Sequence, residues 1–209
     1  TIAYITGAGD DVPASLAQIG YTTDVIDIES LSASSLAKYQ VVLLGIRAFN
    51  TVDALAYKNK ILFDWVKDGG TMIVQYNVSR GLVTEEIAPY LLTLSRDRIT
   101  EENAQVTMLS PDHEALNFPN KITQDDFIGW VQERGLYFPN KWDDAFTPLL
   151  EMNDTGETPT KGALLVAPYG EGYYVYSGLS WFRHLPAGNT GPYRLLSNLI
   201  SLGYKKGKS

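Results

Sequence analysis

Polar side chains follow two strongly apolar segments of the sequence, at the points where each segment ends. Arg47 and Asn50 come directly after the apolar run 41–46, and Gln75 and Asn77 close the run that starts at residue 71. Both runs are short and rich in Val, Leu and Ile, which is typical of strands buried on both faces of a parallel sheet. Open α/β sheets bind ligands at the carboxyl ends of such strands, so we expect these four side chains to contact a ligand.

A second group of candidate residues lies further along the chain. Trp181, Arg183 and His184 occupy a loop between the last predicted strand and the last predicted helix, and Asp126 follows a helix-start pattern at Thr123. Loops on a rigid scaffold often carry functional groups, although a loop ordered only by its own side chains is an equally good interpretation. The predicted ligand-binding residues are therefore Arg47, Asn50, Gln75, Asn77, Asp126, Trp181, Arg183 and His184.

Aromatic residues are numerous in the second half of the chain. They are Trp130, Tyr137, Trp142, Tyr173, Tyr174, Trp181 and Phe182. Such rings can form a platform on which a sugar ring stacks, beside the polar groups named above. The alternative is that they belong to the core or to an interface, because each aromatic side chain buries a large area.

The sequence contains no nucleophile of the kind that α/β hydrolases use. Their strand-to-helix turn exposes a Ser or Cys between small residues, as in Gly-x-Ser-x-Gly, whereas Tyr76 and Asn77 occupy that place here. Ser79 is a weak candidate, because its nearest basic neighbour in sequence is Arg80 and nothing in the sequence ties His184 to it as a base. We therefore predict no catalytic residue.

Cofactor and metal motifs are incomplete. The turn Gly7-Ala8-Gly9 lacks the third glycine of the dinucleotide fingerprint, since Val12 stands there, and the carboxylates of Asp10 and Asp11 would repel a phosphate. The chain has two histidines and no cysteine, so Asp112-His113-Glu114 lacks the further ligands of a zinc site and favours a capped turn. We predict no cofactor and no metal.

Composition limits the function further. The 209 residues carry a formal net charge of −7, which argues against a partner recognised through its phosphates, such as nucleic acid. No apolar run reaches the roughly 18 residues of a membrane helix, so no membrane span is predicted. The chain begins at Thr1, without Met, directly in a strand-like segment. This start favours a domain excised from a longer polypeptide, with a trimmed small protein as the alternative.

The pattern of elements predicts an α/β fold with a mostly parallel central sheet. Strand-like and helix-like segments alternate from the start of the chain to about residue 76, which is typical of βαβ units. The predicted strands are 2–5, 23–28, 39–46 and 71–76, and the predicted helices are 13–20, 31–38 and 52–68.

The second half is less regular. A helix is predicted at 84–94, broken near Pro89, a strand at 104–109, a turn or helical turn at 111–116, and a short helix after Thr123. Residues 128–153 have the composition of loops. An antiparallel hairpin is predicted from 163–167 and 173–177, and a closing helix at 192–202. We expect one domain, residues 1–204, followed by a polar tail, residues 205–209, that carries Lys205, Lys206 and Lys208.

A family resemblance rests on four segments: 74–77, 110–116, the pair Asp125-Asp126, and 166–179. Together they resemble the class I glutamine amidotransferase-like superfamily, and within it the ThuA-like and trimerisation-domain members of carbohydrate-related proteins. Residues 185–194 also resemble the C-terminal domain of large bacterial proteins that begin with a zinc-dependent LmbE/PIG-L deacetylase domain. The resemblance implies a flavodoxin-like three-layer sandwich with a C-terminal antiparallel hairpin.

The chain departs from that superfamily in one decisive respect. Amidotransferases of this type use a cysteine with His and Glu partners, and this chain has no cysteine. The resemblance therefore implies a non-catalytic accessory domain of a periplasmic or secreted, deacetylase-type protein, which binds a carbohydrate or packs on a neighbouring deacetylase domain. Two alternatives remain open: a divergent hydrolase or isomerase that works through Asp126 or His184 on a sugar derivative, and a structural domain used for oligomerisation.

Overall fold

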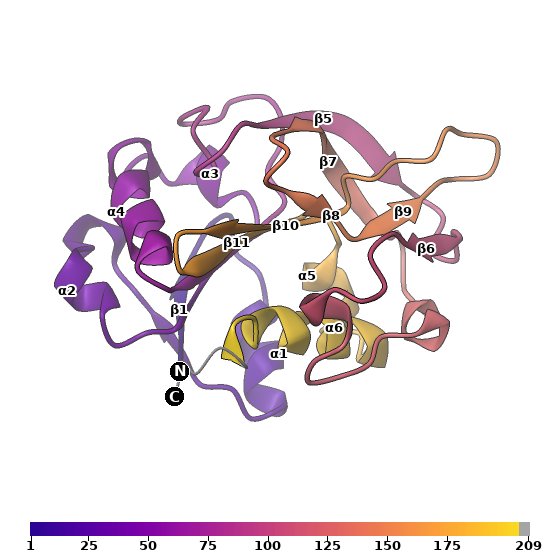
Figure 1. Cartoon of the computed structure of the whole chain (residues 1–209), viewed down its shortest axis with the longest axis horizontal. Coiled ribbons are helices and arrows are strands. Elements are labelled where there is room, and N and C mark those ends of the chain that lie inside the picture. Colours follow the sequence, from indigo (N-terminus) through magenta and orange to yellow (C-terminus); the bar gives the residue numbers. More distant parts are fainter. Residues whose placement is uncertain (205–209) are drawn as a thin grey trace.

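The computed structural model describes residues 1–204, and its centre is a seven-stranded sheet (Figure 1). The strands lie in the order β2-β1-β3-β4-β11-β10-β8, in which the first five run parallel. Strand β10 is antiparallel to β11 and to β8, so a hairpin and a very short strand complete one edge. The bounds are β1 (Ile2–Ile5), β2 (Thr23–Val25), β3 (Val41–Leu44), β4 (Thr71–Gln75), β8 (Thr147–Pro148), β10 (Leu164–Tyr169) and β11 (Gly172–Ser177).

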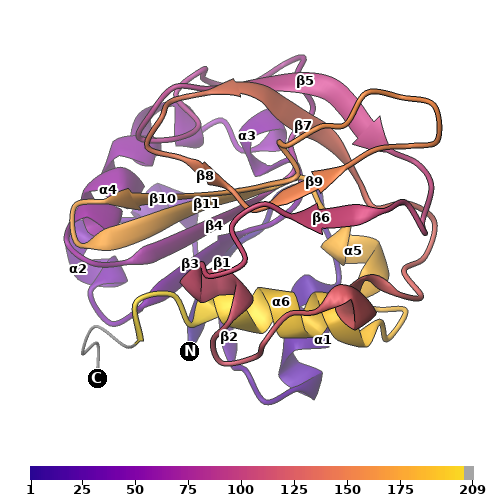
Figure 2. The same ribbon diagram turned by 45° about the vertical axis from the view of Figure 1, so that its right-hand side comes forward.

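Helices cover both faces of this sheet, which confirms the predicted flavodoxin-like three-layer sandwich (Figure 2). Helices α2 (Ala33–Leu36) and α4 (Leu55–Lys67) pack on one face, and α1 (Val12–Gln18) and α6 (Thr190–Ile200) on the other. Short helices complete the set: η1 (Ile28–Ser30), α3 (Ala48–Thr51), η2 (Glu114–Leu116), η3 (Gln124–Phe127) and α5 (Trp181–His184).

Strand β3 shows why the layers hold together. Val42 and Leu44 pack in the core layer beneath α4, whereas Val41 and Leu43 pack in the layer beneath α6. Successive side chains of a strand point to opposite faces, so a strand covered on both sides must be apolar throughout. A fully buried Val or Leu side chain contributes about 1.5–3 kcal/mol to stability, which makes these central strands the main anchor of the fold.

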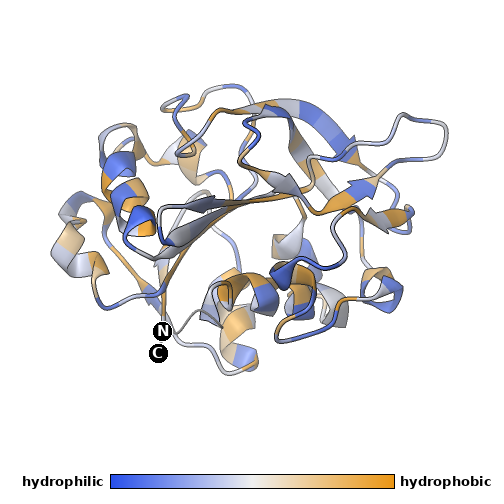
Figure 3. Cartoon of the chain, in the orientation of Figure 1, coloured by the Kyte–Doolittle hydropathy of each residue, from blue (hydrophilic) through white to orange (hydrophobic). Residues whose placement is uncertain are grey.

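A smaller β-structure arches over one end of the sheet. Strand β5 (Leu92–Ile99) pairs with β7 (Gly135–Trp142), and β6 (Val106–Met108) pairs with β9 (Leu150–Met152), both antiparallel. Figure 3 shows hydrophilic residues along the C-terminal half of β5, where Arg96, Asp97 and Arg98 are exposed. The β5–β7 ribbon brings the segment 133–137 to the carboxyl ends of the central strands, because Leu136 donates a backbone hydrogen bond to Gly178 just after β11 (2.9 Å).

The sequence predicted the first half and the last hairpin and helix well, but two predictions for the middle were wrong. The predicted helix 84–94 is a loop that leads into β5, because Pro89 interrupts it and Tyr174 binds the backbone carbonyl of Ile87 (2.6 Å). Strand β7 lies in a segment that was expected to be loop. The predicted polar tail lies outside the described residues.

No helix within residues 1–204 combines the length and the apolar character that crossing a membrane requires.

Candidate functional site

Four parallel strands, β1, β3, β4 and β11, end at the same edge of the sheet. Arg47 follows β3, Tyr76 follows β4, and Phe182 and Arg183 belong to α5 after β11. Glu133 and Tyr137 reach the same place from the start of β7. We call these six residues the aromatic–arginine rim: Arg47, Tyr76, Glu133, Tyr137, Phe182 and Arg183.

Arg47 is the most exposed charged member of the rim. Its backbone is left-handed (φ 57°), and its N–H donates to the carbonyl of Tyr76 (2.8 Å). Its carbonyl accepts from the hydroxyl of Thr51 (3.0 Å), which fixes the turn further. Within residues 1–204 its guanidinium forms no hydrogen bond or ion pair. A left-handed conformation costs a non-glycine residue on the order of 1–3 kcal/mol, and such strain concentrates at functional sites.

Three aromatic rings form the surface beside Arg47. The ring of Tyr76 stacks on that of Tyr137, with centroids 6.3 Å apart and planes 12° apart, and it contacts Phe182 at 5.4 Å. Tyr137 also has a left-handed backbone (φ 52°), so two of the three non-glycine residues with positive φ in the described chain belong to the rim. Tyr137 and Phe182 are half-buried, whereas Tyr76 is 7% exposed. The rim thus presents ring surface supported by a mostly buried tyrosine.

Charged groups hold this surface in place. The Nε of Arg183 donates to Oε1 of Glu133 (2.9 Å), and the hydroxyl of Ser180 donates to the same oxygen (3.0 Å). The guanidinium of Arg183 lies over the ring of Phe182, 4.8 Å from its centroid. Burial raises the pKa of Tyr76, while the nearby guanidinium groups of Arg47 and Arg183 act to lower it. Both cations therefore favour the ionised form of this phenol.

The predicted residues at the end of β4 form the support of the rim rather than its surface. Asn77 is fully buried, its Oδ1 accepts from the N–H of Phe49 (2.9 Å), and its own N–H donates to the hydroxyl of Tyr176 (2.9 Å). Gln75 is also fully buried and donates to the carbonyl of Leu44 (3.2 Å). Asn50 binds the backbone of Val78 through both of its side-chain polar atoms.

Replacing Asn77 with alanine is expected to destabilise the fold by about 2 kcal/mol, because the N–H of Phe49 would stay buried without an acceptor. Guanidinium denaturation would measure the free energy of unfolding. As a control, Asn140→Ala changes an exposed asparagine of β7 and is expected to cost less than about 0.5 kcal/mol. Equal stability of the two variants would contradict the structural role of Asn77.

The other predicted residues lie apart from the rim surface. His184 and Trp181 are fully buried, and Nε2 of His184 lies 2.7 Å from the backbone oxygen of Glu133. That carbonyl can only accept, so the ring is the Nε2–H tautomer, and its Nδ1 is buried without a partner in residues 1–204. Burial lowers the pKa of His184 to about 4, so the ring is neutral at pH 7. Its position against Trp130, at 4.6 Å between centroids, is that of a core histidine.

Asp126 belongs to a different contact, between η3 and α6. Its Oδ1 accepts from Nε of Arg194 (2.8 Å), and its Oδ2 accepts from the N–H of Thr123 (2.9 Å). Of the eight predicted residues, the structure therefore brings Arg47 and Arg183 to one exposed surface. The sequence prediction left out Tyr76 and Glu133. The position of Tyr76 directly after a buried strand was a usable signal, whereas nothing local marked Glu133.

No Ser–His pair accompanies this site within the described residues. Ser180, the serine at the rim, donates to Glu133 rather than to His184, and that histidine has no exposed ring nitrogen. Within residues 1–204, no group of three or more His, Cys, Asp or Glu residues is placed to hold a metal ion. The surface therefore offers rings, two guanidinium groups and one carboxylate for binding.

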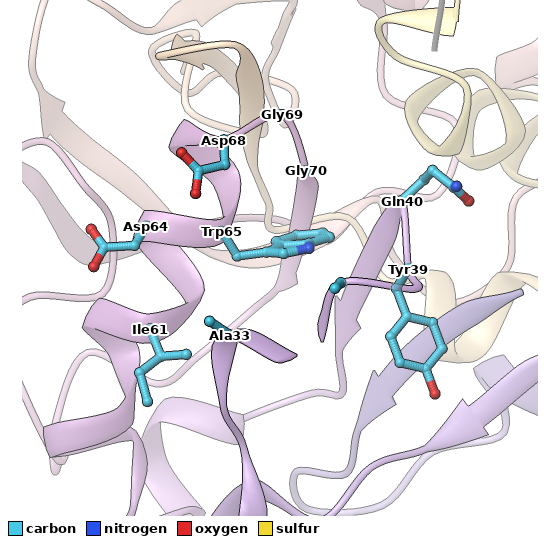
Figure 4. A pocket seen from close by; sticks show the side chains of 10 residues that line it. Ala33, Tyr39, Gln40, Ile61, Asp64, Trp65, Asp68, Gly69 and Gly70 are labelled. Carbon is cyan, nitrogen blue, oxygen red and sulfur yellow. The ribbon is translucent and has the colours of Figure 1, made fainter. Parts of the chain in front are cut away.

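A pocket of about 500 Å³ lies at the opposite edge of the sheet, near the amino ends of β3 and β4. Figure 4 shows the indole of Trp65 lying across it, next to Gly70, with Ala33 on the other side. The carboxylates of Asp64 and Asp68 point away from the indole in this view. This pocket lies between α2 and α4, and its lining includes Gln40, Asp64 and Asp68 beside the indole. It lies at the amino ends of the strands, whereas open α/β sheets bind ligands at the carboxyl ends, so it is a weaker candidate than the rim.

The sequence matches no protein-family model and no curated protein. Solved structures share its fold. A cytoplasmic protein from Salmonella typhimurium is 14% identical, with a TM-score of 0.65 over 96% of this chain and 97% of that one. A protein from Thermoplasma acidophilum, described as part of a GMP synthase, is 10% identical, with a TM-score of 0.58 over 98% and 96% of the two chains. A ThuA-like protein from Parabacteroides merdae is 12% identical, with a TM-score of 0.55 over 100% and 91%.

The chain has the glutamine amidotransferase-like fold. This fold also occurs as part of larger enzymes: the chain matches 31% of the β-galactosidase from Rahnella sp. R3, with 98% of its own length covered, 14% identity and a TM-score of 0.56. In this chain, the place expected for a nucleophile after β4 holds Tyr76 and Asn77. Tyr76 supports the rings of the rim, and Asn77 connects the end of β4 to α3 and β11 through its hydrogen bonds.

Proposed function

We propose that this chain is a non-catalytic accessory domain of a carbohydrate-processing protein and that it binds a sugar on the aromatic–arginine rim. The observation that carries the proposal is the composition of that surface: stacked rings beside an unpaired arginine, at a strand end without a nucleophile. Sugar rings present apolar faces that stack on aromatic side chains, and hydroxyl groups that bind charged and polar groups. The occurrence of the fold in a β-galactosidase supports a carbohydrate context.

We further infer that the parent protein joins this domain to a deacetylase of the LmbE/PIG-L type. The resemblance of residues 185–194 to the C-terminal domain of such proteins supports this inference. Reading the gene upstream of Thr1 tests it: a deacetylase domain in the same reading frame is expected, and a different enzyme or none would contradict it.

Replacing Tyr137 with alanine is expected to weaken sugar binding about 3- to 10-fold, because an aromatic contact contributes about 0.5–1.5 kcal/mol beyond the area it buries. Phe182→Ala should act in the same direction. Calorimetric titration of the chain with a panel of mono- and oligosaccharides would measure the dissociation constants.

Tyr204→Ala is the matched control for this experiment. It removes an exposed tyrosine that lines a hollow with Gln40 and Thr71, at the amino ends of β3 and β4. Its affinity for sugar should equal that of the unchanged chain. The proposed site would be rejected if the chain bound none of the sugars. It would also be rejected if Tyr137→Ala, Phe182→Ala and Tyr204→Ala all lost the same amount of affinity.

A further inference from the structure

We propose that the sugar bound at the aromatic–arginine rim carries an oxyanion, a carboxylate or an ester-linked sulfate or phosphate, and that Arg47 is its main contact. This inference rests on the proposed function and adds the chemical class of the ligand. Its basis is the placement of two arginines around Tyr76. The backbone N–H of Arg47 donates to the carbonyl of Tyr76, and the guanidinium of Arg183 lies over Phe182, whose ring contacts that of Tyr76.

Arg47 is positioned but unpaired. Its backbone is fixed on both sides by the hydrogen bonds to Tyr76 and Thr51, in a conformation that an arginine adopts only at a cost. The side chain nevertheless meets no carboxylate within residues 1–204. In a chain with 24 Asp and Glu against 17 Lys and Arg, an arginine held at a fixed place without an acidic partner is available to an external anion.

Arg183 is the second arginine of the rim. Glu133 and the ring of Phe182 fix its guanidinium, and only Nε is used by Glu133. Its terminal nitrogens make no hydrogen bond within residues 1–204, so an edge with donors remains open. Arginine presents its donors in a planar fork that matches an oxyanion, and such charge-assisted hydrogen bonds are about twice as strong as neutral ones.

The charges of the rim favour an anion over a neutral sugar. Two guanidinium groups and the single carboxylate of Glu133 leave one net positive charge on a surface of otherwise uncharged rings. A neutral sugar would have to cover Arg47 without compensating its charge, whereas an acidic sugar pairs with it. The rings then select the sugar itself, because a free inorganic anion has no face to stack.

The test compares ligands that differ in one group. Calorimetric titration of the chain with glucuronate, glucose 6-sulfate, glucose 6-phosphate, glucose and inorganic phosphate is expected to give binding at least about 10-fold tighter for one of the acidic sugars than for glucose. Inorganic phosphate should bind more weakly than that sugar. The preference should shrink when the salt concentration rises from about 0.05 to about 0.5 M, because salt screens exposed charges.

Variants connect the preference to Arg47. Arg47→Gln should remove most of the preference for the acidic sugar, whereas Arg47→Lys should keep part of it. Both replacements are long, unbranched side chains like arginine, so the cost of the left-handed backbone at this position should be similar. Arg96→Gln, an exposed arginine of β5 outside the rim, changes the net charge equally and should leave binding unchanged. Equal affinity for acidic and neutral sugars would overturn this inference and leave the proposed function standing. Absence of binding to any sugar would overturn both, and inorganic phosphate binding as tightly as the acidic sugar would overturn the inference.

Discussion

Replacing Gly191 with alanine is expected to destabilise the protein by about 3 kcal/mol or more. A Cβ on Gly191 would overlap the carbonyl oxygen of Asp126 and lie 2.7 Å from its Cα, so it would collide with backbone rather than with a movable side chain. The same carbonyl accepts a hydrogen bond from the indole of Trp130 (2.8 Å), and the carboxylate of Asp126 pairs with Arg194. Asp126 therefore cannot move away from the new Cβ without breaking these contacts.

Gly188→Ala is the matched control for this prediction. Gly188 has φ +81°, and no atom lies within 4 Å of its Cβ position, so alanine there meets only the backbone cost of about 1 kcal/mol. Chemical denaturation of both variants would measure the difference. A Gly191→Ala protein as stable as Gly188→Ala would show that α6 does not depend on this contact with η3.

Lowering the pH from 6.5 to 4 is expected to remove about 3 kcal/mol of stability through His184 alone. Its pKa is about 4 in the folded chain, below its ordinary value of 6.5, because burial penalises the charged ring. The unfolded chain therefore takes up a proton first as the pH falls. The contribution is complete above pH 6.5 and is lost as the pH decreases to about 4.

His184→Leu separates this effect from the carboxylates that titrate in the same range. The variant is expected to be less stable at pH 7, because the carbonyl of Glu133 loses its donor, but its stability should fall less steeply between pH 6.5 and 4. His113→Leu removes the other histidine, and in this variant the fall in stability between pH 6.5 and 4 that is due to His184 should remain. Parallel pH profiles for the unchanged chain and His184→Leu would contradict a neutral, buried His184.

The central sheet was predictable because its strands are buried on both faces. Strands β1, β3 and β4 appear as short apolar runs between turn residues, and α4 ends at Lys67, just before the glycines Gly69-Gly70 that indicate its end. Strand β7 was not predictable by the same logic. It contains Pro139, a left-handed Tyr137 and several register shifts against β5, so no alternation of apolar and polar residues marks it.

The sequence predicted where the candidate site lies better than it predicted which residues form its surface. The rule that ligands bind at carboxyl strand ends led to Arg47 and Arg183. It could not show that Gln75 and Asn77 point inward, since this depends on which face of β4 each residue occupies and on which neighbours cover it. His184 and Trp181 are buried because α5 folds back against the core, a contact between segments far apart in sequence.

The two ends of the central sheet limit how the protein can associate. One outer strand, β2, has three residues, and the other, β8, has two, of which Pro148 lacks a backbone N–H. Assembly by β-augmentation needs a row of free backbone donors and acceptors, and neither border supplies one of useful length. A neighbouring domain or a second copy of the chain that docks at either border of the central sheet would therefore do so through side chains instead of prolonging that sheet.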